Sequence, residues 1–143
     1  MDAALSHRHS LTLASEVAAS GKGSEWARAL AGESGVPEDR IAALDLCLVE
    51  LVANIVSHAY RDGPGEIRLD LELGPGTAVL TVTDAGPAFD PLSVASPVVA
   101  ASLEEAKIGG YGIHLVRTSA NACRYERRNG RNVFTTWFGA ATA

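Results

Sequence analysis

Hydrophobic residues recur with two different spacings along the chain, and each spacing predicts one kind of secondary structure. Alternation of apolar and polar residues predicts three β-strands, at 9–14, 66–73 and 78–84. Two more strand-like segments, 123–128 and 132–138, flank the dipeptide Asn129-Gly130. An Asn-Gly pair in this position favours a two-residue hairpin turn, so these two strands should pair with each other.

Apolar residues at helical spacing predict three α-helices. The first should run from about residue 16 to residue 33, although the Gly-Lys-Gly at 21–23 weakens its middle. Pro37 suits the first turn of a long second helix, where a missing backbone N–H costs nothing. The third helix is expected at 111–121. The buried stripe of the second helix should contain Ile41, Leu44, Leu48, Leu51, Val52 and Ile55.

The order of these elements predicts the fold class. One strand and two helices are followed by two strands, a long segment without clear periodicity, a helix and two strands. We expect an α+β two-layer sandwich, in which about three helices cover one face of a mostly antiparallel mixed sheet. Residues 1–143 should form a single domain, with a mobile lid at about 91–108.

Composition and charge exclude several classes of protein. The chain is 47% hydrophobic and 20% charged, which is typical of a folded domain and not of a disordered segment. Its net charge of −5 argues against direct binding to nucleic acid, which needs clustered Lys and Arg. We interpret the one basic cluster as the solvated rim of the hairpin: Arg124, Arg127, Arg128 and Arg131.

The two cysteines, Cys47 and Cys123, lie in apolar segments and form no metal-binding motif. We expect buried free thiols, as in a reducing cytosol. Residues 1–10 lack the apolar run of a signal peptide, and no segment is expected to span a membrane. The sequence therefore predicts a soluble, cytoplasmic protein that makes no membrane contact.

Glu50, Asn54 and His58 repeat every four residues and therefore share one polar stripe of the long helix. An ordinary solvated helix face explains this pattern. However, Asn is unfavourable inside a helix, and a carboxylate one turn before an amide oxygen matches the ligands that Mg²⁺ combines with water and phosphates. From these residues alone, both interpretations stay open.

Two glycine-containing segments are further candidates for a site. Asp84 ends a predicted strand and Gly86 follows, which fits a plain turn or a buried carboxylate that binds a ligand amine beside a flat ring. Gly109, Gly110 and Gly112 lie at the N-terminus of the third helix, which fits a hinge or an anion site of unpaired backbone N–H groups. A dinucleotide-binding fold is disfavoured, because a lid precedes these glycines and their spacing is wrong. A Walker A loop is absent, because no Gly-Lys-Ser/Thr ending occurs.

Together, these segments resemble the Bergerat-fold ATP-binding family. "ELVANIVSHAY" is similar to its N box, "DAGPAFD" to its first glycine box and "GGYGIHL" to its second. Within this family, "HAY", "FDP", "GGYGIHLVR" and "YERRNGRN" most resemble the small anti-sigma-factor serine kinases of the RsbW and SpoIIAB type. The resemblance covers about Pro37 to Phe138.

The resemblance implies a site for ATP and Mg²⁺. Asn54 would bind Mg²⁺, and Glu50 would act as the general base. Asp84 would accept a hydrogen bond from the adenine amino group, with Gly86 near the ring. The phosphates would be held by the backbone of Gly109, Gly110 and Gly112. Five further residues complete the implied ATP site: His58, Ala88, Lys107, Tyr111 and Ile113.

Glu50 favours a serine or threonine acceptor. Sensor histidine kinases usually carry Asn at this position, because an imidazole is already nucleophilic, whereas a hydroxyl gains from a carboxylate that takes its proton. Two departures stand out: Ala88 replaces a usual glycine, and Lys107 is the only cation of the lid. Phosphoryl transfer depends on cations that offset charge, so a lid without arginine indicates slow transfer or none.

The resemblance implies an ATP-dependent protein serine/threonine kinase that is also an anti-sigma, partner-switching regulator and a homodimer. Its substrate would be a STAS-domain anti-anti-sigma protein, and its other partner a sigma factor or another regulator. Two alternatives remain. One is a nucleotide-gated binding module of the same fold without phosphoryl transfer, and the other is a detached ATPase domain of a histidine kinase.

Overall fold

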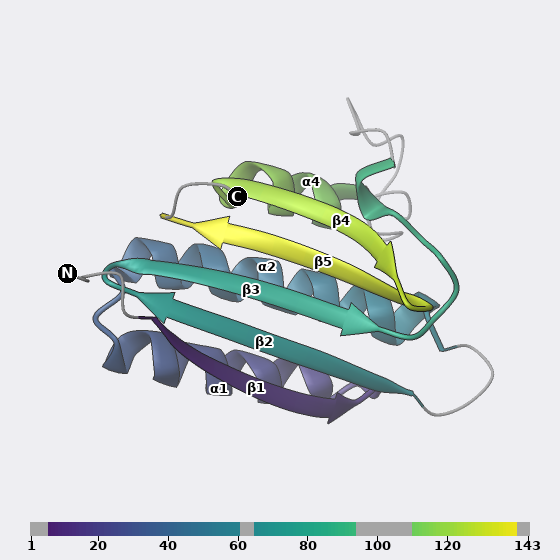
Figure 1. Cartoon of the computed structure of the whole chain (residues 1–143), viewed down its shortest axis with the longest axis horizontal. Coiled ribbons are helices and arrows are strands. Elements are labelled where there is room, and N and C mark those ends of the chain that lie inside the picture. The colour runs from purple at the N-terminus through teal and green to yellow at the C-terminus, as the bar shows by residue number, and fades with distance from the viewer. Residues whose placement is uncertain (1–5, 61–64, 94–109, 140–143) are drawn as a thin grey trace.

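The computed structural model describes residues 6–60, 65–93 and 110–139 (Figure 1). One sheet contains five strands in the order β1-β2-β3-β5-β4: β1 (His7–Ala14), β2 (Glu66–Gly74), β3 (Thr77–Asp84), β4 (Ala122–Arg128) and β5 (Arg131–Phe138). Three helices lie on one face of this sheet: α1 (Ala19–Glu33), α2 (Glu38–His58) and α4 (Gly110–Ser119). A short 3-10 helix, η1 (Pro91–Ser93), follows β3.

The expected two-layer α+β sandwich is confirmed, with one difference in the sheet. All four strand pairs of the described residues are antiparallel, so the sheet is not mixed. Alternation in β2 puts one set of side chains under the helices, and all are at most 1% exposed: Ile67, Leu69, Leu71 and Leu73. The predicted stripe of α2 meets them, because Leu44 and Leu48 are fully buried.

The hairpin between β4 and β5 forms where the Asn-Gly signal predicts it. Asn129 has φ 54° and Gly130 has φ 76°, which are the positive values that a type I′ turn requires at both central residues. This turn fixes the register that pairs Arg127 with Asn132, and β5 in turn pairs Asn132 with Asp84 of β3. The hairpin therefore carries its tip to the same end of the sheet at which β3 ends.

The Gly-Lys-Gly sequence does not interrupt α1, which is continuous across it. A Cβ atom on Gly23 would lie 3.0 Å from Leu48 Cδ2 and 3.0 Å from Leu69 Cδ1. The missing side chain thus lets α1 pack closely against α2 and β2. Glycine lowers the helix propensity at position 23, but a larger residue there would crowd Leu48 and Leu69.

α2 corrects one expectation from the sequence. An 18-residue window within this helix reaches a mean hydropathy of 1.7, so by length and composition the helix is long and apolar enough to span a membrane. In the fold, its apolar stripe is buried in the core formed with the sheet. Of that window, 33% is buried, and the buried core helices of soluble proteins pass the same test of length and hydropathy.

The two cysteines are free, as expected, but they are not equally buried. Cys47 of α2 is fully buried, whereas Cys123 of β4 is partly buried. Burial, with smaller contributions from Cys123 and Glu50, raises the pKa of the Cys47 thiol to about 12. Burial also raises the pKa of Cys123, against the opposing charge of Arg117.

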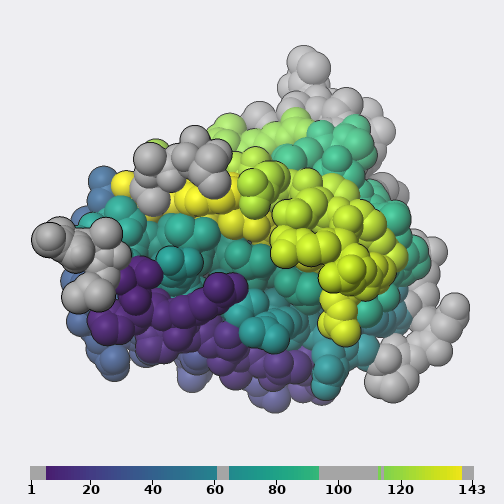
Figure 2. All heavy atoms as spheres, in the orientation of Figure 1, coloured from purple at the N-terminus to yellow at the C-terminus, as the bar shows by residue number. Residues whose placement is uncertain are grey.

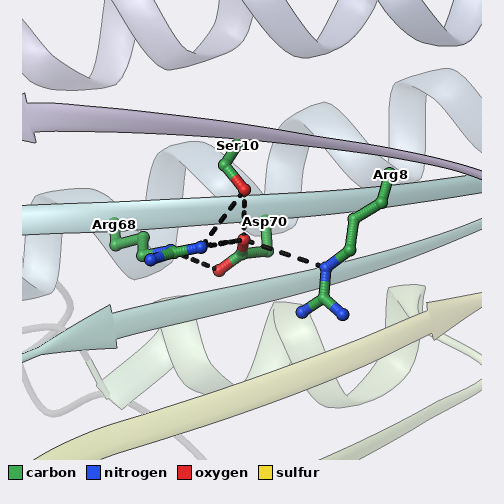
Figure 3. A network of polar contacts seen from close by, with 4 residues as sticks. All are labelled: Arg8, Ser10, Arg68 and Asp70. Atoms are coloured by element: carbon green, nitrogen blue, oxygen red, sulfur yellow. Dashed lines mark hydrogen bonds and ion pairs between the residues drawn. The ribbon is translucent and has the colours of Figure 1, made fainter.

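The face of the sheet that the helices leave uncovered carries a polar network around Asp70 (Figure 3). The Asp70 carboxylate accepts a hydrogen bond of 2.5 Å from the Ser10 hydroxyl and three from Arg68, at 3.0, 3.1 and 3.3 Å. Arg8 lies 4.0 Å away. Burial alone would raise the pKa of Asp70, but the bonds and charges of Arg68, Ser10 and Arg8 together lower it.

Candidate functional site

The polar stripe of α2 forms one wall of the candidate site. Glu50 and Asn54 are partly buried and His58 is exposed, on three successive turns of the helix. None of the three has a hydrogen bond or ion pair within the described part of the chain. The Glu50 carboxylate and the Asn54 amide thus lie half-covered by the fold with their polar atoms available to a ligand.

Asp84, the last residue of β3, lies at the base of the site and is 7% exposed. Its Oδ1 accepts two hydrogen bonds, from the Gly86 N–H at 2.8 Å and from Asn132 Nδ2 at 3.0 Å. Its Oδ2 accepts none from the described residues, and no fully buried side-chain oxygen there lacks a partner. Oδ2 therefore retains some exposure and is the oxygen that a ligand can reach.

Gly86 joins the end of β3 to the end of α2. A Cβ atom there would lie 2.8 Å from Ala59 Cβ, 3.0 Å from Ala59 O and 3.0 Å from Asp84 Oδ1. The glycine is therefore required by the protein's own packing. Because Ala59 follows His58 directly, the same contact brings Asp84 to the C-terminal end of the α2 stripe.

Tyr60 closes this corner with a pair of hydrogen bonds. Its hydroxyl accepts from the Ala85 N–H at 2.7 Å and donates to the Glu66 carbonyl at 2.7 Å. The residue after α2 thus ties the start of β2 to the loop 85–89 that follows Asp84. The sequence motif "HAY" indicated kinship through this residue but not its contacts.

Asn132 of β5 is the main site residue to which the sequence assigned no role, although it ends the segment "YERRNGRN" that carries part of the family resemblance. It is 7% exposed and bonds both to Asp84 and to the Pro87 carbonyl, the latter at 2.9 Å. Only the strand register reveals it, because Asn132 is the residue of β5 directly opposite Asp84. That pairing crosses 48 positions of sequence and has no local signal.

Arg127 corrects the interpretation of the basic cluster as a purely solvated rim. Residues of β4 gather at the edge of the molecule, in yellow-green in Figure 2, and all four arginines of the hairpin are exposed. Arg127 nevertheless donates to the Gly86 carbonyl at 2.9 Å and to Asn132 Oδ1 at 3.2 Å. Arg124 instead lies over the Trp137 ring, 5.5 Å from its centroid. One member of the cluster therefore belongs to the site.

The second glycine segment lies only partly within the described residues. Lys107 and Gly109 are outside them, as is most of the expected lid. Gly110 begins α4, and Tyr111 and Gly112 follow in its first turn, so the expected placement of the glycines at a helix N-terminus is confirmed for these positions. This end of α4 points toward the end of the sheet at which β3 ends (Figure 1).

The two remaining residues of the predicted ATP site, Ala88 and Ile113, differ in their exposure to solvent. Ala88 is exposed on the loop after β3. Ile113 is 4% exposed and packs in the hydrophobic core, so its visible role is to anchor the first turns of α4. No group of three or more His, Cys, Asp and Glu residues that could hold a metal ion occurs in residues 6–60, 65–93 and 110–139.

A polar helix stripe, an adjacent carboxylate at a strand end and a glycine-rich helix start are thus arranged around one end of the sheet. Residues 13–137 match the family model described as the histidine kinase-like ATPase domain. The chain belongs to the histidine kinase-like ATPase domain family.

Relatives of this histidine kinase-like ATPase domain include named protein kinases. It is 42% identical over 93 residues to the serine/threonine-protein kinase BtrW of Bordetella bronchiseptica, a match that covers 64% of this chain and 66% of BtrW. It is 27% identical over 111 residues to the serine-protein kinase RsbW of Bacillus cereus, with 75% of this chain and 69% of that protein covered. The chain thus spans about two thirds of the length of these curated relatives.

A solved structure supports the fold. The crystal structure of the RsbU and RsbW domains of Rv1364c from Mycobacterium tuberculosis matches with a TM-score of 0.66 at 18% sequence identity. The match covers 92% of this chain and 32% of that one. At this identity the match establishes the shared architecture, and the chemistry has to be argued from the residues.

Proposed function

We propose that this domain is an ATP-dependent protein serine/threonine kinase. The observation that carries the proposal is Glu50, a partly buried carboxylate without a protein partner in the described chain, one helical turn before Asn54. The names of the two relatives, a serine/threonine-protein kinase and a serine-protein kinase, support the same reaction class.

The proposed nucleotide site assigns one role to each polar group. Asp84 Oδ2 accepts a hydrogen bond from the adenine amino group, because Oδ1 already accepts two within the protein. The backbone of Gly109, Gly110 and Gly112 binds the phosphates, which suits the positive end of α4. Asn54 holds Mg²⁺, which neutralises phosphate charge when bound. The amide of Asn54 has no partner among the described residues, which fits this role, since Mg²⁺ takes few protein ligands together with water and phosphate oxygens.

Glu50 is proposed as the general base. A serine or threonine hydroxyl of the substrate attacks the γ-phosphorus of ATP, its proton passes to the Glu50 carboxylate, and ADP leaves with the electrons of the broken bond. The position of Glu50 one turn from Asn54 would hold this carboxylate beside the phosphates. Lys107 would be the one lid cation near the transferring group.

The proposed biological role is that of an anti-sigma, partner-switching regulator in the cytoplasm. Its substrate would be a STAS-domain anti-anti-sigma protein, its other partner a sigma factor or similar regulator, and its active form a homodimer. The resemblance to RsbW-type kinases supports this role. Phosphorylation of the antagonist would end its binding and leave the kinase available to the second partner.

One observation supports an alternative function, that of a nucleotide-gated binding module that transfers no phosphoryl group. The segment 91–108 contains no arginine to offset charge on a transferring phosphoryl group. The other alternative, a detached ATPase domain of a histidine kinase, is disfavoured by Glu50. Acid-labile phosphate on an acceptor protein would support that alternative.

Glu50→Gln separates the kinase from the binding module. We expect this variant to lose at least ~100-fold in phosphoryl transfer to a STAS-domain protein of the same organism while its ATP affinity changes less than about 3-fold. Glu25→Gln on α1, an exposed glutamate without a partner in the described chain, is the matched control. Equal transfer by Glu50→Gln and Glu25→Gln would refute the role of Glu50. Absent transfer by the wild type, with ATP binding retained, would favour the binding module.

A further inference from the structure

We infer that Asn132 is a positioning residue that makes the nucleotide site selective for a base with a 6-amino group. Its side-chain amide occupies one oxygen of the Asp84 carboxylate and leaves the other for the base. The inference rests on the proposed nucleotide site, and adds a specificity determinant from β5 that lies outside the three sequence boxes.

The donor half of the Asn132 amide is fully used. Nδ2 carries two N–H groups, and it donates to Asp84 Oδ1 at 3.0 Å and to the Pro87 carbonyl at 2.9 Å. The Gly86 N–H donates to the same Oδ1 at 2.8 Å. A carboxylate oxygen has about two lone-pair positions, so Oδ1 is saturated by the protein. Only Oδ2 remains to accept a hydrogen bond from a ligand.

The acceptor half of the amide fixes its orientation. Asn132 Oδ1 accepts from the Tyr125 hydroxyl at 2.6 Å, from the Phe89 N–H at 3.1 Å and from Arg127 at 3.2 Å. The Phe89 N–H and the Arg127 guanidinium can only donate, so a flipped amide would place its own N–H groups against them. Phe89 and Arg127 therefore determine which edge of Asn132 faces Asp84, and the loop 85–89 is bound to the hairpin by the same amide.

This arrangement predicts selectivity through its polarity. A carboxylate that presents a single unpaired oxygen accepts a hydrogen bond from an amino group but opposes the carbonyl oxygen of a 6-oxo purine. A buried acceptor that loses its donor costs binding free energy. A site that hydrogen-bonds the amino group therefore rejects analogues without that group more strongly than an apolar pocket could. If Asn132 is removed, Asp84 can rotate and both oxygens become available, so the preference for an amino group should weaken.

The experiment measures the coupling between residue 132 and the 6-amino group. Calorimetry with Mg²⁺ gives the affinity of ATP and of purine riboside triphosphate, which lacks that amino group, for the wild type, Asn132→Asp and Asn132→Ala. Asn132→Asp is nearly isosteric and keeps the acceptor for Tyr125, Phe89 and Arg127, so it is informative even if Asn132→Ala does not fold. We expect the preference for ATP over the analogue to fall by about 10-fold in both variants.

A matched control and an arm for the proposed site complete the design. Asn121→Asp is the control, because the Asn121 amide also accepts a hydrogen bond from a backbone N–H, that of Gly139 at 2.6 Å. Asn121 lies at the other end of the same hairpin, so this substitution should leave the preference for ATP over the analogue unchanged. Equal losses for both nucleotides in folded Asn132 variants, or no loss, would overturn the inference. Unchanged ATP affinity in Asp84→Ala would instead overturn the proposed pocket itself.

Discussion

Replacing Gly86 by alanine tests the junction on which the candidate site depends. The added Cβ would lie 2.8 Å from Ala59 Cβ and 3.0 Å from both the Ala59 carbonyl oxygen and Asp84 Oδ1. Two of these neighbours belong to the helix end and its backbone, and the third is held by Asn132. None is the loose end of a flexible side chain, so the conflict can be relieved only by moving the loop or the end of α2.

The expected cost follows from overpacking. Forcing one methyl group into a tightly packed junction typically costs ~1–3 kcal/mol, which for a domain of this size lowers the Tm by about 3–10 °C. Because the shift displaces the residue next to the Asp84 carboxylate, Gly86→Ala should also weaken ATP binding by at least ~10-fold. Thermal unfolding followed by circular dichroism, and calorimetry with Mg·ATP, measure the two effects.

Gly21→Ala on α1 is the matched control. Nothing lies within 4 Å of a Cβ atom at Gly21, and the residue is exposed within a helix. The same substitution should therefore stabilise the protein by up to ~1 kcal/mol, because alanine favours the helix. Opposite signs for the two variants would support the packing argument. A Gly86→Ala protein with wild-type Tm and wild-type ATP affinity would refute it.

Three further predictions concern single side chains. Asp84→Ala should weaken ATP binding by ~10-fold or more with the fold retained, as measured by calorimetry and circular dichroism; unchanged affinity would contradict the pocket. Asp70 has a lowered pKa in the fold, so its contribution is present above the unfolded pKa of about 4 and is lost as pH falls through the lower folded value. Urea unfolding should therefore show Asp70→Asn less stable than the wild type at pH 7, with the difference shrinking below about pH 4, and a constant difference would contradict this. Cys47, with a pKa of about 12, should react with a disulfide reagent at pH 8 only after unfolding, whereas Cys123 should react first; rapid labelling of both thiols in the native state would contradict the buried position.

Local signals in the sequence predicted the elements and half of the site. The Asn129-Gly130 turn, the apolar stripe of α2 and the polar stripe with Glu50 and Asn54 are all periodic or dipeptide patterns, and the structure confirms where they lie. Such patterns work because backbone geometry repeats at short range. The family resemblance then supplied roles that spacing alone left open.

The other half of the site depends on contacts between distant segments. The bond between Asn132 and Asp84 follows from the register of β3 and β5, and the bond from Arg127 to the Gly86 carbonyl follows from the hairpin lying beside the loop 85–89. A basic residue in a hairpin looks solvated in sequence because nothing local distinguishes the guanidinium that bonds to a loop from those that face water. The tight approach of Ala59 likewise gives Gly86 a second role that no motif indicates.

The kinase proposal is tested most directly by the intact mass of a STAS-domain protein from the same organism. The STAS-domain protein is incubated with Mg·ATP and with either the wild-type domain or the Glu50→Gln variant. The account predicts a gain of one acid-stable phosphate with the wild type and none with Glu50→Gln. No gain with the wild type, while calorimetry still detects ATP binding, would contradict the kinase and leave a nucleotide-gated binding module in its place.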